Sequence, residues 1–351
     1  MAGHNPNLTR DQKKHLKENA LRGWELVQST ARLAAMNLML HGIGSDKSVP
    51  IVVADALAAD PGERFEVVLA NPPFGKKSST MITGAEGKVS TEKDIIERDD
   101  FWATTSNKQL NFVQHIKTLL KQHGRAAVVV PDNVLFEGGA GETIRKKLLH
   151  ECDVHTLLRL PTGLFYAQGV KANVIFFERK PASETPWTKK LWIYDLRTNK
   201  HFTLKTSPMR REDLDEFVAC YNPANRHERK PTWFDADAPP LQGARPAASG
   251  RRSASGQHAA RNPRFAPGPL PASGAREEGL SGRWRAYGYD ELISRDKASL
   301  DIFWLRDDAL ADSDNLPPPD VIAQEIVDDL EAALEQFRLI AGDLGSNEAT
   351  E

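Results

Sequence analysis

The sequence is poor in features that mark several protein classes. It has only two cysteines, Cys152 and Cys220, which stand far apart and outside any CxxC spacing. This argues against a disulfide framework and against a zinc cluster. No apolar run approaches the roughly 18 residues of a membrane span, and the polar start has no signal-peptide stretch. We therefore expect a cytoplasmic protein with no membrane partner.

An excess of either charge is also missing. The 46 Lys and Arg residues balance 48 Asp and Glu residues, which gives a formal net charge of −2. No general positive field draws such a chain to nucleic acid, so any DNA contact must be local or supplied by a partner. His150 and His155 have no acidic or thiol companions at ligand spacing, and we expect no metal site.

What the sequence does have is an alternation of helix and strand patterns. Thr9 to Gln12 has capping-box spacing and opens a helix toward Arg22. Continuous apolar strands separated by helices are typical of a mostly parallel α/β sheet covered on both faces. The last two strands lack a helix between them, which predicts an antiparallel edge. The other helices are expected at residues 31–40, 107–122 and 142–150, and the strands at residues 51–54, 65–70, 126–130, 154–160, 173–178 and 191–195.

Composition divides the chain into three predicted parts. Residues 1–235 carry the α/β pattern. From about Leu241 to Gly282 nearly every residue is Ala, Gly, Pro, Ser or Arg, which is too little apolar surface to offset the ordering entropy, so we predict a disordered linker at residues 236–282. Residues 283–351 are predicted to be a helical region, in which Asp320 follows three prolines and starts a helix with an apolar stripe.

Three polar residues follow one another at predicted strand ends or links. Glu25, Asp55 and Asn71 come in this order, and ligands of doubly wound sheets lie outside the carboxyl ends of the strands. Asn71 opens the loop Asn71-Pro72-Pro73-Phe74. Its prolines fix two φ angles, which holds the Asn71 amide oxygen and the Pro72 carbonyl in place as hydrogen-bond acceptors.

Such a pair of acceptors suits the chemistry of an aromatic amino group. The nitrogen is a poor nucleophile because its lone pair is delocalised into the ring, and two acceptors favour a more pyramidal, more reactive nitrogen. Phe74 offers a face for a base swung out of a duplex. The alternative is a proline-terminated strand in which Phe74 only packs, with Glu25 as a surface carboxylate and Asp55 as a cap.

Several stretches together resemble one family. The chain is similar to the methylation subunit of type I restriction-modification systems, a family of adenine-N6 DNA methyltransferases with a Rossmann-like sheet. The resemblance implies that Glu25 holds the ribose of S-adenosylmethionine, that Asp55 bonds its adenine, and that Asn71, Pro72, Pro73 and Phe74 form the catalytic loop. It also implies a specificity subunit that reads DNA and a restriction subunit as partners. The stretches that carry it are Leu21–Val27, Ala34–Leu38, Asn71–Phe74, Thr105–Leu110 and Val130–Phe136.

One part of the family pattern has no counterpart. Family members carry a first strand with an acidic, glycine-rich loop for the cofactor's methionine end, and nothing before Thr9 matches it. We therefore expect an amino-terminally truncated sheet that binds cofactor weakly unaided. Two other hypotheses remain: a non-catalytic assembly component, or a methyltransferase acting on RNA or protein glutamine. The helix after Pro319 is expected to contact the specificity subunit.

Overall fold

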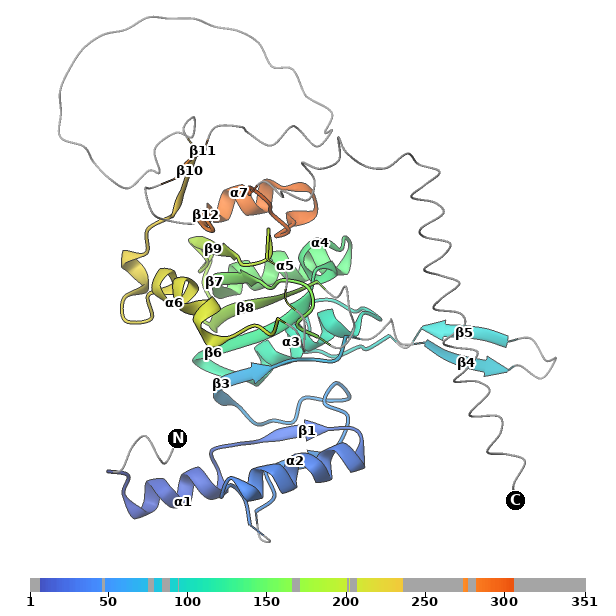
Figure 1. Cartoon of the computed structure of the whole chain (residues 1–351). Coiled ribbons are helices and arrows are strands. Elements are labelled where there is room, and N and C mark those ends of the chain that lie inside the picture. The colour runs from blue at the N-terminus through green and yellow to red at the C-terminus, as the bar shows by residue number, and fades with distance from the viewer. Residues whose placement is uncertain are drawn as a thin grey trace, which may run out of the picture. The chain divides into compact units, whose positions relative to one another are not determined.

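The computed structural model describes residues 7–45, 48–74, 79–83, 89–93, 95–165, 171–200, 202, 207–235, 274–276 and 282–305. Most of the predicted linker and the helix predicted from Asp320 lie outside these residues. Within the linker, the structure describes β11 (Gly274–Arg276), which pairs antiparallel with β10 (Trp233–Asp235). Figure 1 shows the elements in chain order.

A six-stranded mixed sheet is the centre of the fold (Figure 1). The β3–β6 and β7–β9 pairs are parallel, whereas β12–β9, β7–β8 and β8–β6 are antiparallel. The α/β class is confirmed, with more antiparallel pairing than the sequence indicated. In spatial order the strands are β12 (Trp284–Gly288), β9 (Lys190–Asp195), β7 (Cys152–Arg159), β8 (Ala172–Arg179), β6 (Leu120–Pro131) and β3 (Phe65–Ala70).

The antiparallel pairing predicted between the last two strands is wrong. β8 lies between β6 and β7, and β9 lies beyond β7 and parallel to it. The segment that joins β8 to β9 crosses the start of β7. There the Thr188 hydroxyl donates to the Cys152 carbonyl and accepts from the Val154 N–H, both at 2.8 Å. This anchored crossing makes the non-adjacent order possible without a helix.

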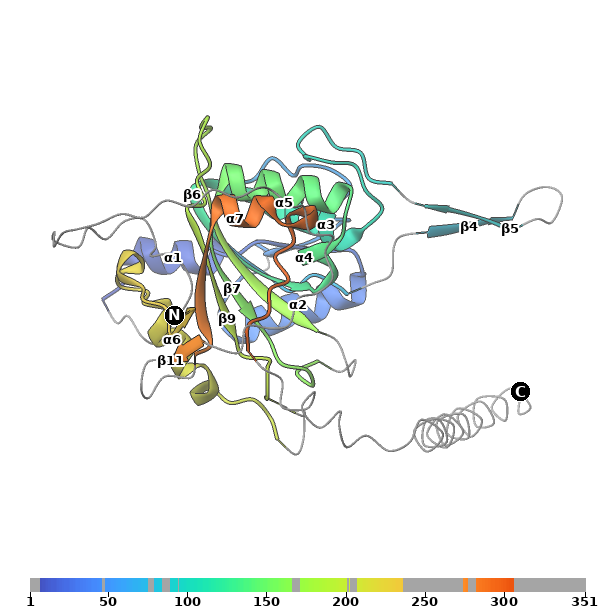
Figure 2. The same cartoon turned by 90° about the horizontal axis from the view of Figure 1, so that it is seen from above.

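Strand periodicity places a separate core on each face of the sheet. On one face α3 (Lys108–Leu119), α5 (Ala140–Glu151) and α7 (Tyr289–Ser294) pack on the alternate residues of β6 and its neighbours (Figure 2). On the other face α6 (Asp215–Tyr221) packs through Phe217 on Tyr194 and Trp284. Residues 284–305, assigned from sequence to the carboxyl-terminal region, thus belong to the main sheet and its cores.

The amino-terminal elements form a smaller parallel pair. α1 (Arg10–Glu18) begins with the predicted capping box, in which Thr9 and Gln12 exchange hydrogen bonds. The helix ends at Glu18, before the predicted Arg22, and Gly23 is the first residue of a strand. β1 (Gly23–Glu25) pairs parallel with β2 (Ile51–Val53), and α2 (Gln28–Leu40) connects them.

Short elements complete the described fold. β4 (Ser79–Thr83) and β5 (Val89–Lys93) pair antiparallel after the Asn71 loop. α4 (Asn133–Phe136) is a single turn at the end of β6. Among the described residues, no helix is long and apolar enough to cross a lipid bilayer. Within the described residues, 3-10 turns occur at Arg211–Leu214, Arg226–Glu228 and Asp296–Ala298.

Candidate active site

The predicted polar residues all lie at carboxyl ends of strands. Glu25 is the last residue of β1, and not part of a link as the sequence suggested. Its partner in the parallel ladder is Val53 of β2, and the Ala54 N–H donates to the Glu25 carbonyl at 3.1 Å. Asp55 is the residue after Ala54. The carboxylates of Glu25 and Asp55 therefore lie at the carboxyl ends of two neighbouring parallel strands. Asn71 follows the last residue of β3.

Each carboxylate also shapes its own loop. Glu25 Oε1 accepts from the Val27 N–H at 2.8 Å, and Asp55 Oδ1 accepts from the Leu57 N–H at 2.9 Å. The alternative for Asp55 was a helix cap, and its contact is similar except that a turn follows it. The alternative for Glu25 was a surface carboxylate, and its side chain instead contacts the backbone and is partly buried. In each carboxylate one oxygen accepts the hydrogen bond from its own loop. The second oxygen is the one assigned to the predicted contact with the nucleoside of the cofactor.

The Asn71 loop combines an exposed amide with a packed aromatic ring. Asn71 is exposed, whereas Pro72 beside it is buried. Phe74 packs against the second core and meets Phe165 edge-on, with 5.5 Å between ring centroids and 80° between ring planes. Phe165 lies in the segment after β7, and no pattern in the sequence around it predicts its contact with Phe74. Phe74 therefore packs as the alternative interpretation proposed, and this contact helps to hold the loop.

An ion pair that the sequence did not predict joins the strand ends near this loop. β3, β6, β7 and β9 all run in one direction. Arg197, two residues after β9, donates twice to Asp132 beyond β6 at 2.8 Å, and once to the Leu160 carbonyl beyond β7 at 2.9 Å. Burial alone would raise the pKa of Asp132, but hydrogen bonds from Arg197 and Asn173 outweigh it and hold the pKa below its usual range.

Two of the stretches that carry the family resemblance have structural roles at the edge of the sheet. Asn107 caps α3 by accepting from the Gln109 and Leu110 N–H groups, and its own amide donates to Glu137 at 2.6 Å. The stretch Val130–Phe136 supplies Asp132 to the ion pair and the Val134 carbonyl to Arg145. Both stretches fix the edge of the sheet at which Asn71 lies.

The described residues fit only part of S-adenosylmethionine. Carboxylates at the ends of two adjacent parallel strands suit the hydroxyl and amino groups of its nucleoside. The acidic, glycine-rich loop that the resemblance implies for the methionine end has no counterpart among the described residues before Thr9. No group of three metal-ligating side chains occurs in the described part of the chain.

A sheet with acidic strand ends and an Asn-Pro-Pro-Phe loop defines the class of methyltransferases that act on amino groups. Residues 5–236 match the family model described as N-6 DNA Methylase. The chain belongs to the N-6 DNA Methylase family.

Several curated relatives agree with this assignment. The chain is 37% identical to the type I restriction enzyme StySJI methylase subunit of Salmonella typhimurium, over 93% of this chain and 56% of the relative. It is also 37% identical to the EcoKI methylase subunit of Escherichia coli K12, with the same coverage. The crystal structure of the EcoKI M protein superposes with a TM-score of 0.64 at 34% identity, covering 98% of this chain and 64% of that one. The chain thus spans a little over half the length of the curated relatives it matches.

Proposed function

We propose that this chain carries the catalytic half of a site-specific DNA methyltransferase that transfers a methyl group to adenine N6. One observation carries the proposal. The Asn71 amide stands exposed at the carboxyl end of β3, on a loop fixed by the buried Pro72 and by the contact of Phe74 with Phe165. The family match and the names of the relatives favour DNA over RNA or protein glutamine as the substrate.

The chemistry follows from this fixed loop. The Asn71 amide oxygen and the Pro72 carbonyl accept hydrogen bonds from the adenine amino group, which favours the pyramidal nitrogen that attacks a methyl group. Because the acceptors are in place before the base arrives, they need no reorganisation as charge develops on the nitrogen. Phe74 offers its face to a base rotated out of the duplex. S-adenosylmethionine, when bound, supplies the methyl group.

The partners follow from the balanced charge and the relatives. A chain with a net charge of −2 has no general attraction to DNA, so a separate specificity subunit positions the DNA. A restriction subunit completes the type I complex, as the names of the relatives suggest. Glu25 and Asp55 hold the ribose and the adenine of the cofactor, and the complex works in the cytoplasm.

Methyl transfer by the assembled complex tests the proposal. The chain is combined with its specificity subunit and supplied with S-adenosylmethionine carrying a labelled methyl group, and nucleosides of the digested DNA are separated by mass spectrometry. Because the described residues fit only part of the cofactor, the reaction also contains the part of the EcoKI methylase subunit that has no counterpart in this chain. We expect label in N6-methyladenine, and no label when Asn71→Ala replaces the native chain. Label in another nucleoside, or undiminished label with Asn71→Ala, would rule the assignment out.

A further inference from the structure

The turn that follows β2 determines how Asp55 is presented. The Leu57 N–H donates to Asp55 Oδ1 at 2.9 Å, and the Ala58 N–H donates to the Asp55 carbonyl at 3.3 Å. The Leu57 side chain is 3% exposed, whereas Asp55 itself is exposed. The direction of the second carboxylate oxygen of Asp55 therefore depends on how this turn is held.

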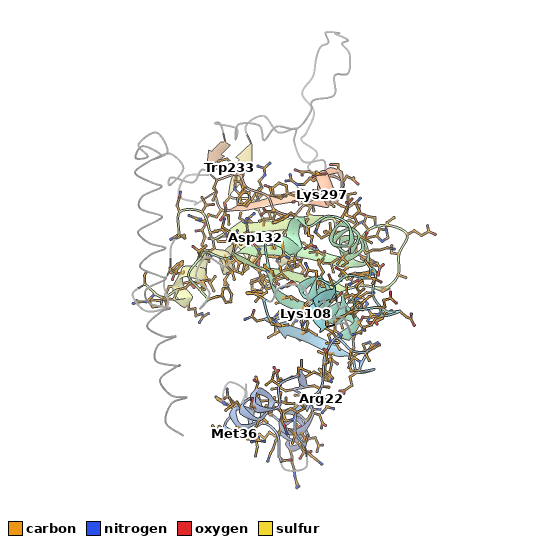
Figure 3. The ribbon with its side chains drawn as sticks, turned by 90° about the vertical axis from the view of Figure 1, so that its right-hand side faces the viewer. Arg22, Met36, Lys108, Asp132, Trp233 and Lys297 are labelled. Atoms are coloured by element: carbon orange, nitrogen blue, oxygen red, sulfur yellow. The ribbon has the colours of Figure 1, made fainter. Side chains whose placement is uncertain are left out.

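A buried arginine connects this turn to α3, whose first residue, Lys108, is labelled in Figure 3. Arg98 lies 41 residues after Leu57 in the sequence, and its side chain is 4% exposed. Its Nη1 donates to the Leu57 carbonyl at 3.4 Å and to His115 Nδ1 of α3 at 3.2 Å. Burial, with the charge of Arg98, lowers the pKa of His115 to about 4. The ring is therefore neutral near pH 7, and its Nδ1 accepts from the guanidinium, which can only donate.

The guanidinium of Arg98 is fixed by the segment in which it lies. Asp100 accepts two hydrogen bonds from it, at 2.9 and 2.7 Å, and also accepts from the Thr118 hydroxyl of α3 at 2.5 Å. The side-chain amide of Gln114 holds the same segment, because its oxygen accepts from the Trp102 N–H at 2.8 Å. α3 thus fixes the guanidinium, and the guanidinium holds the turn that carries Asp55.

A second arginine bonds elsewhere in the same loop. Arg64 donates to Asp60 at 2.6 and 2.8 Å and to the Glu63 carbonyl at 2.9 Å, and its side chain is 32% exposed. Its hydrogen bonds lower the pKa of Asp60 to about 2, and the charge of Arg98 contributes to the same shift. The two arginines thus place positive charge on one loop, but Arg98 is the one that contacts the carbonyl of the Asp55 turn.

We propose that Arg98 is a positioning residue for the adenine of S-adenosylmethionine. By holding the Leu57 carbonyl, it directs the second carboxylate oxygen of Asp55 toward the 6-amino group of the base. This inference rests on the proposed role of Asp55 and deepens it. Loss of the guanidinium weakens recognition of the amino group and leaves recognition of the ribose by Glu25 unchanged. An arginine that only stabilised the fold would affect both alike.

Binding of two nucleosides tests the proposal without any measurement of activity. Adenosine contains the part of the cofactor that the described residues fit, so the full chain is titrated with it alone. Purine riboside is the same nucleoside without the 6-amino group, and ligand-detected NMR gives the Kd of each. We expect the native chain to prefer adenosine by about tenfold, as one hydrogen bond to a carboxylate allows. Arg98→Met should reduce this preference to about twofold or less and leave the Kd of purine riboside unchanged.

Asp55→Asn distinguishes a failure of this inference from a failure of the proposed function. It keeps an oxygen for the Leu57 N–H and places an amide N–H where the second oxygen was, so it should lose the preference for adenosine. In that background Arg98→Met should have no further effect on the preference. If the native chain prefers adenosine no more than Asp55→Asn does, the cofactor role of Asp55 is wrong and this inference fails with it. If Asp55→Asn loses the preference and Arg98→Met keeps it, only the inference about Arg98 is wrong.

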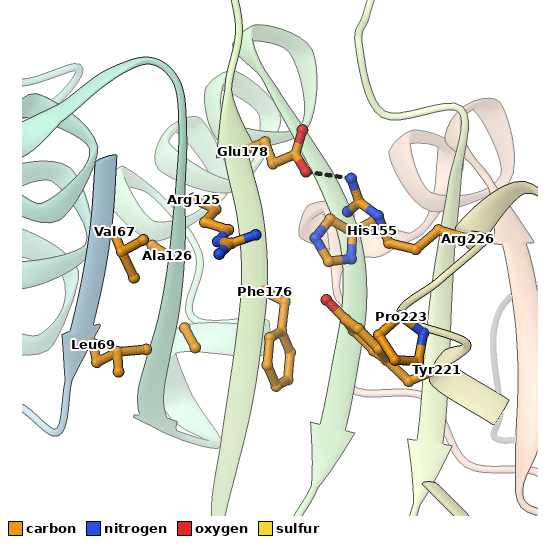
Figure 4. A pocket seen from close by; sticks show the side chains of 11 residues that line it. Val67, Leu69, Arg125, Ala126, His155, Phe176, Glu178, Tyr221, Pro223 and Arg226 are labelled. Carbon is orange, nitrogen blue, oxygen red and sulfur yellow. Dashed lines mark hydrogen bonds and ion pairs between the residues drawn. The ribbon is translucent and has the colours of Figure 1, made fainter. Parts of the chain in front are cut away.

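Two control variants address the loss of charge and the place of binding. Arg64→Met removes an arginine from the same loop and should leave the preference for adenosine unchanged. On the other face of the sheet, Leu69 and Phe176 line a cavity of about 430 Å³ that is large enough for a nucleoside (Figure 4). Leu69 is 78% exposed, so Leu69→Lys changes this cavity without disturbing the core, and both Kd values should stay the same.

Three results of these titrations would overturn the proposal. Equal losses of affinity for both nucleosides in Arg98→Met would show that Arg98 acts only through the fold. The same loss of preference in Arg64→Met would show that the charge of the loop is sufficient. Loss of adenosine binding in Leu69→Lys would place the nucleoside in the cavity and away from Asp55.

Discussion

Arg145 offers a direct measure of how the segment 297–305 is bound to the catalytic sheet. Its side chain is 2% exposed and donates to the carbonyls of Val134, Glu137, Lys297 and Ala298, at 2.7 to 3.1 Å. Burial lowers its pKa to about 10. Taking the charged group out of water costs hydration, and the contribution of each hydrogen bond is what remains after that cost.

The hydrogen bonds outweigh this cost. Four bonds from a charged donor contribute about 1.5 kcal/mol each at the low end of their range, or about 6 kcal/mol together. Arg145→Met removes these bonds and leaves the four carbonyls without this donor, so we expect the free energy of unfolding to fall by about 3–6 kcal/mol. Urea denaturation of the chain, followed by the fluorescence of Trp284 and Trp304, measures it.

A neighbour on the same helix supplies the control. The Lys146 side chain is 44% exposed and pairs with Glu142 at 2.6 Å. Lys146→Met should change the free energy of unfolding by no more than about 0.5 kcal/mol, because exposed pairs of this kind contribute little. If Arg145→Met lost less than about 1 kcal/mol, or stabilised the chain, the reasoning from the four carbonyl contacts would be refuted.

Three further predictions concern the site and its supports. Phe165→Ala removes the edge-on partner of Phe74. Because such ring pairs contribute about 0.5–1.5 kcal/mol, the rate of methyl transfer by the assembled complex should fall by about 2- to 13-fold. An unchanged rate would argue against a positioning role of Phe165. Arg197→Met removes two hydrogen bonds from the partly buried Asp132 carboxylate, while the bond from Asn173 stays, so the free energy of unfolding should fall by about 1–3 kcal/mol. Asp132→Asn in the same chain should restore part of this loss. Burial, with the charge of Arg98, lowers the pKa of His115 from 6.5 to about 4, so the unfolded chain binds more protons than the folded one between these values. The free energy of unfolding is therefore unaffected by this group above about pH 6.5 and falls by up to about 3 kcal/mol as the pH drops toward 4. His115→Gln should flatten that part of the pH profile of stability. An equally steep profile in the variant would show that His115 is not the titrating group.

The sequence predicted the parts of the fold that depend on local pattern. β3 matches the predicted range of residues 65–70, and the capping box at Thr9 begins α1 as expected. Strand order was not predictable in the same way, because every strand of a sheet buried on both faces is a similar apolar run. The position of β9 depends on Thr188, which binds the backbone at the start of β7 from 34 and 36 residues away.

The same distinction applies to the candidate site. Asp55 and Asn71 were proposed because residues at strand ends can be read from local order along the chain, and the structure places both at strand ends. Glu25 was expected in a link and is the last residue of β1. Phe165 and Arg197 were missed because their partners, Phe74 and Asp132, lie far from them in sequence and only the folded sheet brings each pair together. Arg197 lies two residues after β9, at the start of a turn, and nothing around it in the sequence indicates that its guanidinium joins three strand ends.

Two substitutions of Asn71, compared in the assembled complex, test the central claim most directly. Asp keeps an acceptor oxygen at the position of the amide oxygen, whereas Leu has a similar size and no acceptor. If Asn71 activates the amino group by accepting its hydrogen bond, Asn71→Leu should lower kcat by about 10²–10³-fold and Asn71→Asp by clearly less. Equal losses of kcat in both variants, with both chains folded, would contradict the account.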